Sequence, residues 1–137
     1  MKKYVGFFFI VYILMQINNL SYGQDDRWIY VTEGVNSVSY IDKLTVECDS
    51  DGNIFAWIKS ECIKDCDIES SEKTVDYFLI NTKFYSQKRK SRTIEFITYY
   101  TDKTTNNHNV EYKDDILVPD SIAEITYDYV FSNFSCK

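Results

Sequence analysis

Residues 44–58 (LTVECDSDGNIFAWI) decide the fold predicted for this chain of 137 residues. Two runs rich in apolar residues flank an Asp/Gly/Asn cluster. These residue types tolerate the backbone angles of a tight reversal, so the stretch predicts a β-hairpin. Apolar and polar residues alternate from Leu44 to Cys48, which predicts a strand with one buried face. The second run, IFAWI, is apolar on both faces, so we expect it near the centre of a sheet that is covered on its second side.

The amino terminus predicts a signal peptide. Lys2 and Lys3 precede the apolar run VGFFFIVYILM, and small residues stand at Ser21 and Gly23, so we expect cleavage after Gly23. The run is too short for a bilayer core, which takes about 20 residues. An uncleaved anchor at the membrane interface is the alternative. Residues 1–23 are thus the predicted signal peptide and residues 24–137 a single domain that is exported, without an integral membrane segment, to the periplasm, the outer surface or the medium.

The composition predicts an acidic β-domain. The formal net charge is −6, and loss of Lys2 and Lys3 makes the mature chain more negative. This argues against nucleic acid or an anionic membrane as the main partner. Tyr is favoured in strands, so the 12 tyrosines fit an antiparallel sheet with a partly aromatic exposed face. Ordinary packing within strands is the other explanation for the tyrosines.

The four cysteines predict two disulfides, because an even number in a small exported domain usually forms a disulfide framework. Four cysteines allow three connectivities. Among them we favour Cys48 with Cys136 and Cys62 with Cys66. Pairing Cys136 with any cysteine of the body would pin a terminus that otherwise frays. A metal site at Cys62 and Cys66 is disfavoured because exported thiols tend to oxidise.

The remaining chain supplies further strands. The predicted fold is α+β: an antiparallel sheet of about six strands, arranged as a meander of hairpins, with a carboxy-terminal helix packed on it. Residues 101–115 are polar without periodicity and predict a surface loop in which His108 is solvated. The strands are expected at residues 27–32, 35–41, 44–48, 54–61, 74–85 and 92–100.

Pro119 and the sequence SIAE mark the start of the helix. Ser121 and Glu124 form a capping-box pattern, in which Ser accepts from the backbone at Glu124 and Glu reaches back. Ile122, Ile125 and Tyr129 recur at helical spacing, which predicts one stripe that packs on the sheet. We expect this helix to cover the strand that contains Trp57.

Several short aromatic motifs, in this order, resemble the surface-adhesin protein E family of small exported bacterial domains. They are Trp28-Ile29-Tyr30, Tyr40-Ile41-Asp42-Lys43, Trp57-Ile58-Lys59, Tyr99-Tyr100-Thr101-Asp102 and Val118-Pro119-Asp120-Ser121 before a helix that ends in Cys136. The resemblance spans nearly all of residues 27–136.

This resemblance implies an antiparallel sheet with a carboxy-terminal helix packed against it. For the adhesin that names the family, it also implies binding of host extracellular-matrix and serum proteins. One departure concerns the disulfides. Family members often carry a cysteine where this chain has Thr82, and that cysteine would pair with the one near the end, so Cys136 needs another partner here.

The function expected from the sequence is a non-enzymatic binding module of the bacterial cell envelope, an adhesin contacting host proteins. The alternative is a structural or accessory periplasmic protein that pairs with another envelope protein. No motif for a catalytic nucleophile, phosphate loop, metal or cofactor is present. A cluster of cations near the second hairpin tip could steer a protein partner, although such charges also guard sheet edges. These candidate binding residues are Lys83, Lys88, Arg89, Lys90 and Arg92.

Overall fold

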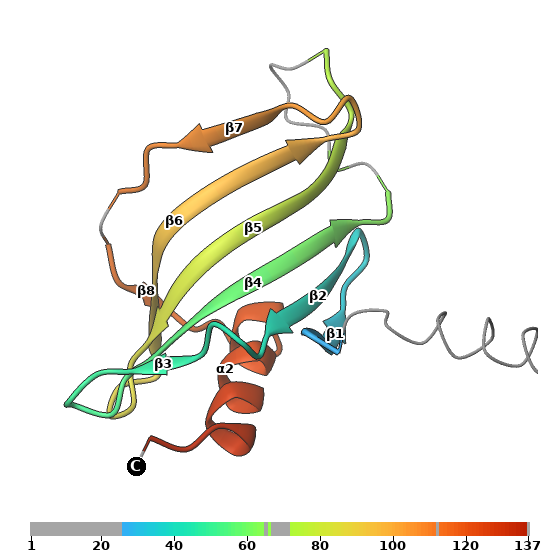
Figure 1. The fold of residues 1–137 in the computed structure, drawn as a ribbon. Coiled ribbons are helices and arrows are strands. Elements are labelled where there is room, and N and C mark those ends of the chain that lie inside the picture. Colours follow the sequence, from blue (N-terminus) through green and yellow to red (C-terminus); the bar gives the residue numbers. More distant parts are fainter. Residues whose placement is uncertain (1–25, 65, 67–71, 112, 137) are drawn as a thin grey trace, which may run out of the picture.

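The computed structural model describes residues 26–64, 66, 72–111 and 113–136. The expected signal peptide and residues 65 and 67–71 of the expected 62–73 loop lie outside these ranges. The described chain forms one antiparallel sheet and one helix, as predicted (Figure 1). The elements are β1 (Trp28–Glu33), β2 (Ser37–Asp42), β3 (Glu47–Cys48), β4 (Ile54–Cys62), β5 (Val75–Phe84), β6 (Lys90–Tyr100), β7 (Thr105–His108), β8 (Asp115–Ile116) and α2 (Ile122–Asn133).

The sheet is a meander with strand order β1-β2-β4-β5-β6-β7, and β3 and β8 add short pairings to β4 and β6. The predicted hairpin of residues 44–58 is present, since Glu47 lies opposite Phe55 and Cys48 opposite Ile54. Its first strand is only two residues long, and Leu44 is 73% exposed rather than buried. The central position predicted for the IFAWI strand is correct, because β4 pairs with β2 on one side and β5 on the other.

The core lies on one face of the sheet only. Alternate residues of β4, namely Ile54, Ala56 and Ile58, pack with Val130 of α2 and with Ile41. The helix therefore does lie over the strand that contains Trp57, but on the face opposite to that side chain. In Figure 1, α2 lies against the lower part of the sheet, and the upper parts of β5, β6 and β7 extend beyond it.

The helix begins as predicted, and the stripe that packs on the sheet contains Tyr129 of the predicted set but not Ile125. The hydroxyl oxygen of Ser121 accepts a hydrogen bond from the backbone N–H of Glu124 at 3.2 Å, and the Glu124 carboxylate accepts from the N–H of Asp120 at 2.9 Å. The buried residues are Thr126, Tyr127 and Val130, whereas Ile125 is 42% exposed. The hydroxyl of Thr126 can be buried because it donates to the carbonyl of Ile122 at 2.7 Å.

The helix and the loop after β6 differ from their predicted extents. The helix ends at Asn133, three residues before the cysteine at which the resemblance would end it. Residues 101–115 are not a simple loop, because they contain β7 and the start of β8. Within the described ranges, no helix is long and apolar enough to cross a bilayer.

Candidate interaction surfaces

The face of the sheet opposite α2 carries a continuous set of aromatic side chains, here called the aromatic face. Directly opposite residues of antiparallel strands share a face, so the registers of the strand pairs define the set. None of its members belongs to the core, and all are half-buried or exposed. The aromatic face consists of Trp28, Tyr30, Tyr40, Phe55, Trp57, Tyr77 and Tyr99, with Leu79 and Ile97 between them.

Ring contacts order this face. Tyr77 and Tyr99 lie opposite each other on β5 and β6, and their rings stack with centroids 4.5 Å apart. Tyr30 and Tyr40 meet edge to face at 6.1 Å on β1 and β2. Desolvation, with a smaller effect of the neighbouring Tyr99 phenol, raises the pKa of Tyr77, so that phenol stays neutral at physiological pH.

Lys59 stands at the centre of the aromatic face. Its ammonium nitrogen lies 4.8 Å from the centroid of the Tyr77 ring and 5.8 Å from that of Trp28, within cation–π range. It also forms an ion pair with Glu61 at 2.5 Å. The aromatic face is thus not purely apolar: the ion pair of Lys59 with Glu61 lies within it, and Asn81, Lys83 and Glu95 share the face by register.

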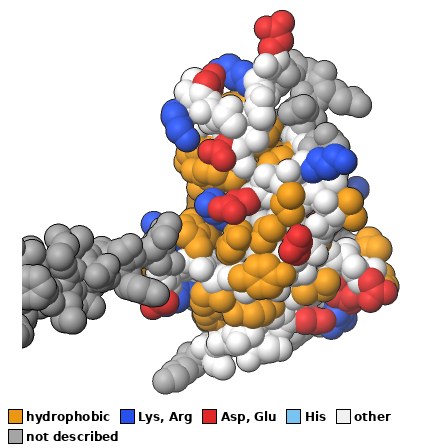
Figure 2. Space-filling view, turned by 90° about the vertical axis from the view of Figure 1, so that its right-hand side faces the viewer, with side chains coloured by type: hydrophobic (Ala, Val, Ile, Leu, Met, Phe, Trp, Pro, Cys, Tyr) orange, Lys and Arg blue, Asp and Glu red, His pale blue; other side chains and the backbone are white. Residues whose placement is uncertain are grey.

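Figure 2 shows one side of the molecule, on which hydrophobic side chains gather over the lower half and single charged groups stand between them. Contiguous exposed apolar area of this kind marks interaction sites on soluble proteins more often than scattered single residues do. The strand registers and the burial of the side chains, rather than this view, show that the aromatic residues share one partly exposed face.

Three of the five candidate binding cations are engaged within the chain. Lys83 pairs with Asp49 at 3.0 Å, and Arg92 with Asp114 at 2.6 Å. Arg89 reaches the helix, where it contacts Glu124 at 2.7 Å and Asp128 at 3.1 Å.

These ion pairs change the electrostatics of the hairpin tip. Arg89 lowers the pKa of Glu124, and Arg92, with help from the hydroxyl of Tyr85, lowers that of Asp114. Arg89 also joins the hairpin to the helix, which is a structural role. Among the described residues, Lys88 and Lys90 form no ion pair, so they are the members of the cluster that remain available to a partner.

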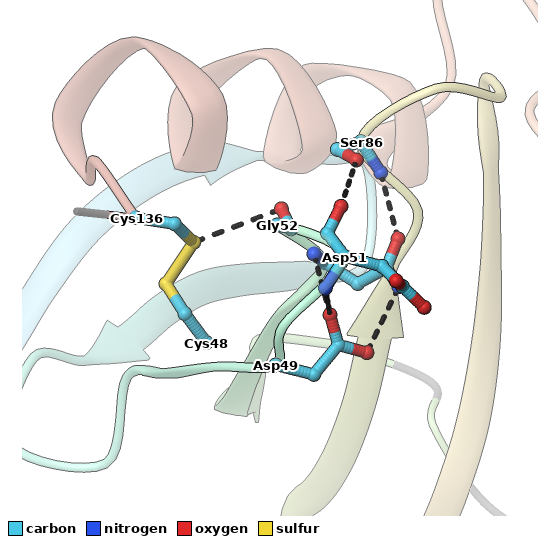
Figure 3. The surroundings of a disulfide bond; sticks show 7 residues. Cys48, Asp49, Asp51, Gly52, Ser86 and Cys136 are labelled. Atoms are coloured by element: carbon cyan, nitrogen blue, oxygen red, sulfur yellow. Dashed lines mark hydrogen bonds between the residues drawn. A yellow bond between two sulfur atoms is a disulfide. The ribbon is translucent and has the colours of Figure 1, made fainter.

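The predicted turn at residues 49–53 is built around the Asp49 carboxylate. One of its oxygens accepts from the backbone N–H groups of Asp51 and Asn53 at 3.0 and 2.9 Å, and the other accepts from the Asn53 side chain. Hydrogen bonds from Asn53 and Lys83 hold the pKa of Asp49 far below its usual value. The turn also holds the next hairpin, because the hydroxyl of Ser86 donates to the carbonyl of Asp51 (Figure 3).

A disulfide between Cys48 and Cys136 fastens the chain end beside this turn (Figure 3). The Cα atoms are 5.7 Å apart, and the Cys136 sulfur lies 3.6 Å from the carbonyl oxygen of Gly52. The second disulfide joins Cys62 to Cys66. These are the two pairs favoured from the sequence, and they are consistent with an exported protein.

His108 is half-buried in β7 rather than solvated in a loop. Its ring stacks on Phe96 with centroids 4.7 Å apart, and its Nε2 atom lies 2.7 Å from the hydroxyl oxygen of Thr98. These contacts fasten β7 to β6. In the part of the chain that the structure describes, no three His, Cys, Asp or Glu side chains are grouped as a metal site requires.

Comparison of the chain with protein-family models, with curated proteins and with solved structures finds no match.

Proposed function

We propose that this chain is an exported, non-enzymatic binding module of the bacterial cell envelope and that the aromatic face is its contact with a protein partner. The observation that carries the proposal is the uncovered row of Trp and Tyr side chains on the face opposite α2. In line with the resemblance to the surface-adhesin protein E family, the partner we propose is a host protein, which makes the module an adhesin.

The physics of protein interfaces supports this assignment. Tyr and Trp dominate interface hot spots because they bring a large, rigid, amphipathic surface at low cost in conformational entropy. Here they stand on neighbouring strands of one sheet, and ring stacking and the Lys59 ammonium already order several of them. A partner would therefore meet a preorganised surface.

The charges at the hairpin tip take a smaller part in the proposal. Lys88 and Lys90 are the cations that can attract an acidic partner surface, and their contribution is to the rate of encounter. Replacing both with alanine should slow association at low salt while leaving the dissociation rate unchanged. An unchanged association rate would show that the hairpin tip does not contribute to binding.

The export part of the proposal is supported by the two disulfides and by the signal-peptide pattern of residues 1–23. Protease treatment of intact cells tests the location, with a periplasmic protein as control. Loss of the mature protein would place it outside the cell. Full protection would confine it to the periplasm and exclude direct contact with a host.

Binding is tested with the mature chain on immobilised extracellular-matrix proteins. A double variant, Tyr30→Lys with Tyr99→Lys, places two charges on the aromatic face and should weaken retention at least tenfold. Val35→Lys is the matched control, because Val35 is 94% exposed in the β1–β2 turn, outside the aromatic face. Equal retention of both variants would refute the role of the aromatic face.

The second candidate function is a periplasmic accessory protein that pairs with another envelope protein through a sheet edge. It is favoured by β1, which is the end of the strand order and pairs with β2 alone among the described strands. Such an edge offers backbone groups for strand addition. Stoichiometric co-purification with one envelope protein, insensitive to the Tyr30→Lys/Tyr99→Lys variant, would favour it.

A further inference from the structure

An open groove of about 470 Å³ lies on the helix-bearing face of the sheet, beside the first turn of α2. It exists because the floor changes from bulky to small side chains where the helix no longer covers the sheet. Ser39 lies opposite Ser60 on β2 and β4, and Thr82 lies opposite Thr93 on β5 and β6. These small residues leave a hollow that larger apolar side chains would fill.

The floor needs no polar ligand. Among the described residues, no side-chain nitrogen or oxygen atom that is shut off from solvent lacks a hydrogen-bond partner, so the floor holds no buried polar atom that requires a polar ligand. The floor strands β4 and β5 also have neighbours on both sides, so their backbones offer no free edge to a peptide. These facts favour an occupant whose body is an apolar chain.

The walls of the groove are aliphatic. Ile58, Ile80 and Ile122 line its interior, and Ile116 and Val118 form part of its lining while being 74% and 65% exposed. Large aliphatic side chains that stand in water beside a groove mark it as a site for apolar contact. The volume lies within the range of about 300–1,000 Å³ that is usual for small-molecule sites.

A second, more polar hollow of about 450 Å³ adjoins the groove, and Thr93 and Asp115 line both. Asp115 is the one charged residue in the lining of the apolar part. The second hollow adds Glu111 and Lys113, both exposed. Along its length the groove thus changes from apolar to charged, with two carboxylates and one ammonium at the charged end.

We propose that this groove binds a single-chain zwitterionic phospholipid. The alkyl chain occupies the apolar part, Lys113 receives the phosphate, and Glu111 and Asp115 receive the ammonium group. An anionic head such as a carboxylate or sulfate fits less well, because the two acidic groups outnumber the one basic group at the charged end.

The probes are octyl-, decyl- and dodecylphosphocholine, titrated by calorimetry into the mature protein below their micelle concentrations. Burial of each methylene should tighten binding about fourfold until the groove is full. Dodecyl sulfate should bind more weakly than dodecylphosphocholine. Absence of saturable binding, an affinity independent of chain length, or tighter binding of the sulfate would each overturn the proposal.

Two variants locate the binding site. Ala123→Trp places an indole in the lining of the groove from an exposed position of α2, and it should weaken decylphosphocholine binding at least tenfold. Ser132→Trp adds the same side chain to the same helix outside the groove lining and should bind as the parent chain does. Equal affinities of the two variants would refute the groove as the site.

A charge variant tests the polar end without touching the folded core. Lys113→Glu lies in an exposed segment and should weaken decylphosphocholine binding, while the uncharged decyl maltoside should bind as before. Equal loss for both amphiphiles, or for neither, would show that Lys113 does not receive the phosphate.

Discussion

Removal of the Cys48–Cys136 disulfide should destabilise the protein far more than removal of Cys62–Cys66. The first joins residues 88 positions apart and the second residues 4 positions apart. By the chain-entropy model at 25 °C, closing the long loop stabilises the folded state by about 4.6 kcal/mol, and closing the short one by about 2 kcal/mol. The expected difference between the two losses is therefore roughly 2.5 kcal/mol.

The assay compares the parent chain with two double variants, Cys48→Ala/Cys136→Ala and Cys62→Ala/Cys66→Ala, in guanidinium without reductant. Double variants avoid free thiols that could exchange with the remaining disulfide. The unfolding free energy is extrapolated to water, and the denaturant slope should rise for the first variant because its unfolded chain is more expanded. Equal losses, or a larger loss for the Cys62/Cys66 variant, would refute the loop-entropy reasoning.

Three further predictions concern stability. Hydrogen bonds from Thr104, and to a smaller extent from Lys73, lower the pKa of Asp102 from 3.8 to about 2. The stabilising contribution of Asp102 is therefore present above pH 4 and is lost as the pH falls towards 2. Asp102→Asn should flatten this part of the curve of stability against pH, measured by circular dichroism. Ile58→Ala on the core face should lower the free energy of unfolding in urea by about 3 kcal/mol, whereas Leu79→Ala on the aromatic face should lower it by about 1 kcal/mol or less. Equal losses would mean that both faces of the sheet are covered. Gly52→Ala should lower the free energy of unfolding by about 1 kcal/mol, because Gly52 has a φ of +76°. Gly52→Asn should lower it less, since Asn tolerates a positive φ better than Ala does. An equal loss of melting temperature for both variants would exclude backbone strain as the cause.

Local chemistry made much of the fold predictable. The Asp/Gly/Asn turn, the strand apolar on both faces and the Ser121 cap are each specified by a few adjacent residues, and the structure contains all three. The cysteine pairing present is the one favoured among three, although pinning the chain end did not select it, because all three connectivities would bond Cys136. The tyrosine content was compatible with an exposed aromatic face as well as with ordinary packing within strands, and it did not indicate which side of β4 the helix would cover.

Other features depend on residues far apart in the sequence. The strand β7 is polar and has no alternating pattern, so its position follows from the open edge of β6 and from the His108 ring on Phe96. The partners of Arg89, at positions 124 and 128, come after β6, β7 and β8 in the sequence. The two carboxylates are four residues apart on one helix face, and this spacing was a signal for an ion-pair site that could have been used.

The groove beside α2 could not be predicted from the sequence for a similar reason. Small hydroxyl residues in strands usually face solvent, and only the observed register shows that Ser39, Ser60 and Thr82 share the face on which the core lies. These small residues can be identified in the sequence, but they indicate a groove only when the position of the helix over the sheet is known.

The bond between Cys48 and Cys136 also determines how the molecule would respond to tension. If its two ends were pulled apart, the force would pass directly from Cys136 to Cys48. Of the described residues, only those before Cys48, which include β1 and β2, could be drawn out, roughly 75 Å of extended chain. The sheet from β4 onwards and the helix would be mechanically shielded, and single-molecule stretching with and without a reductant would measure the difference in length.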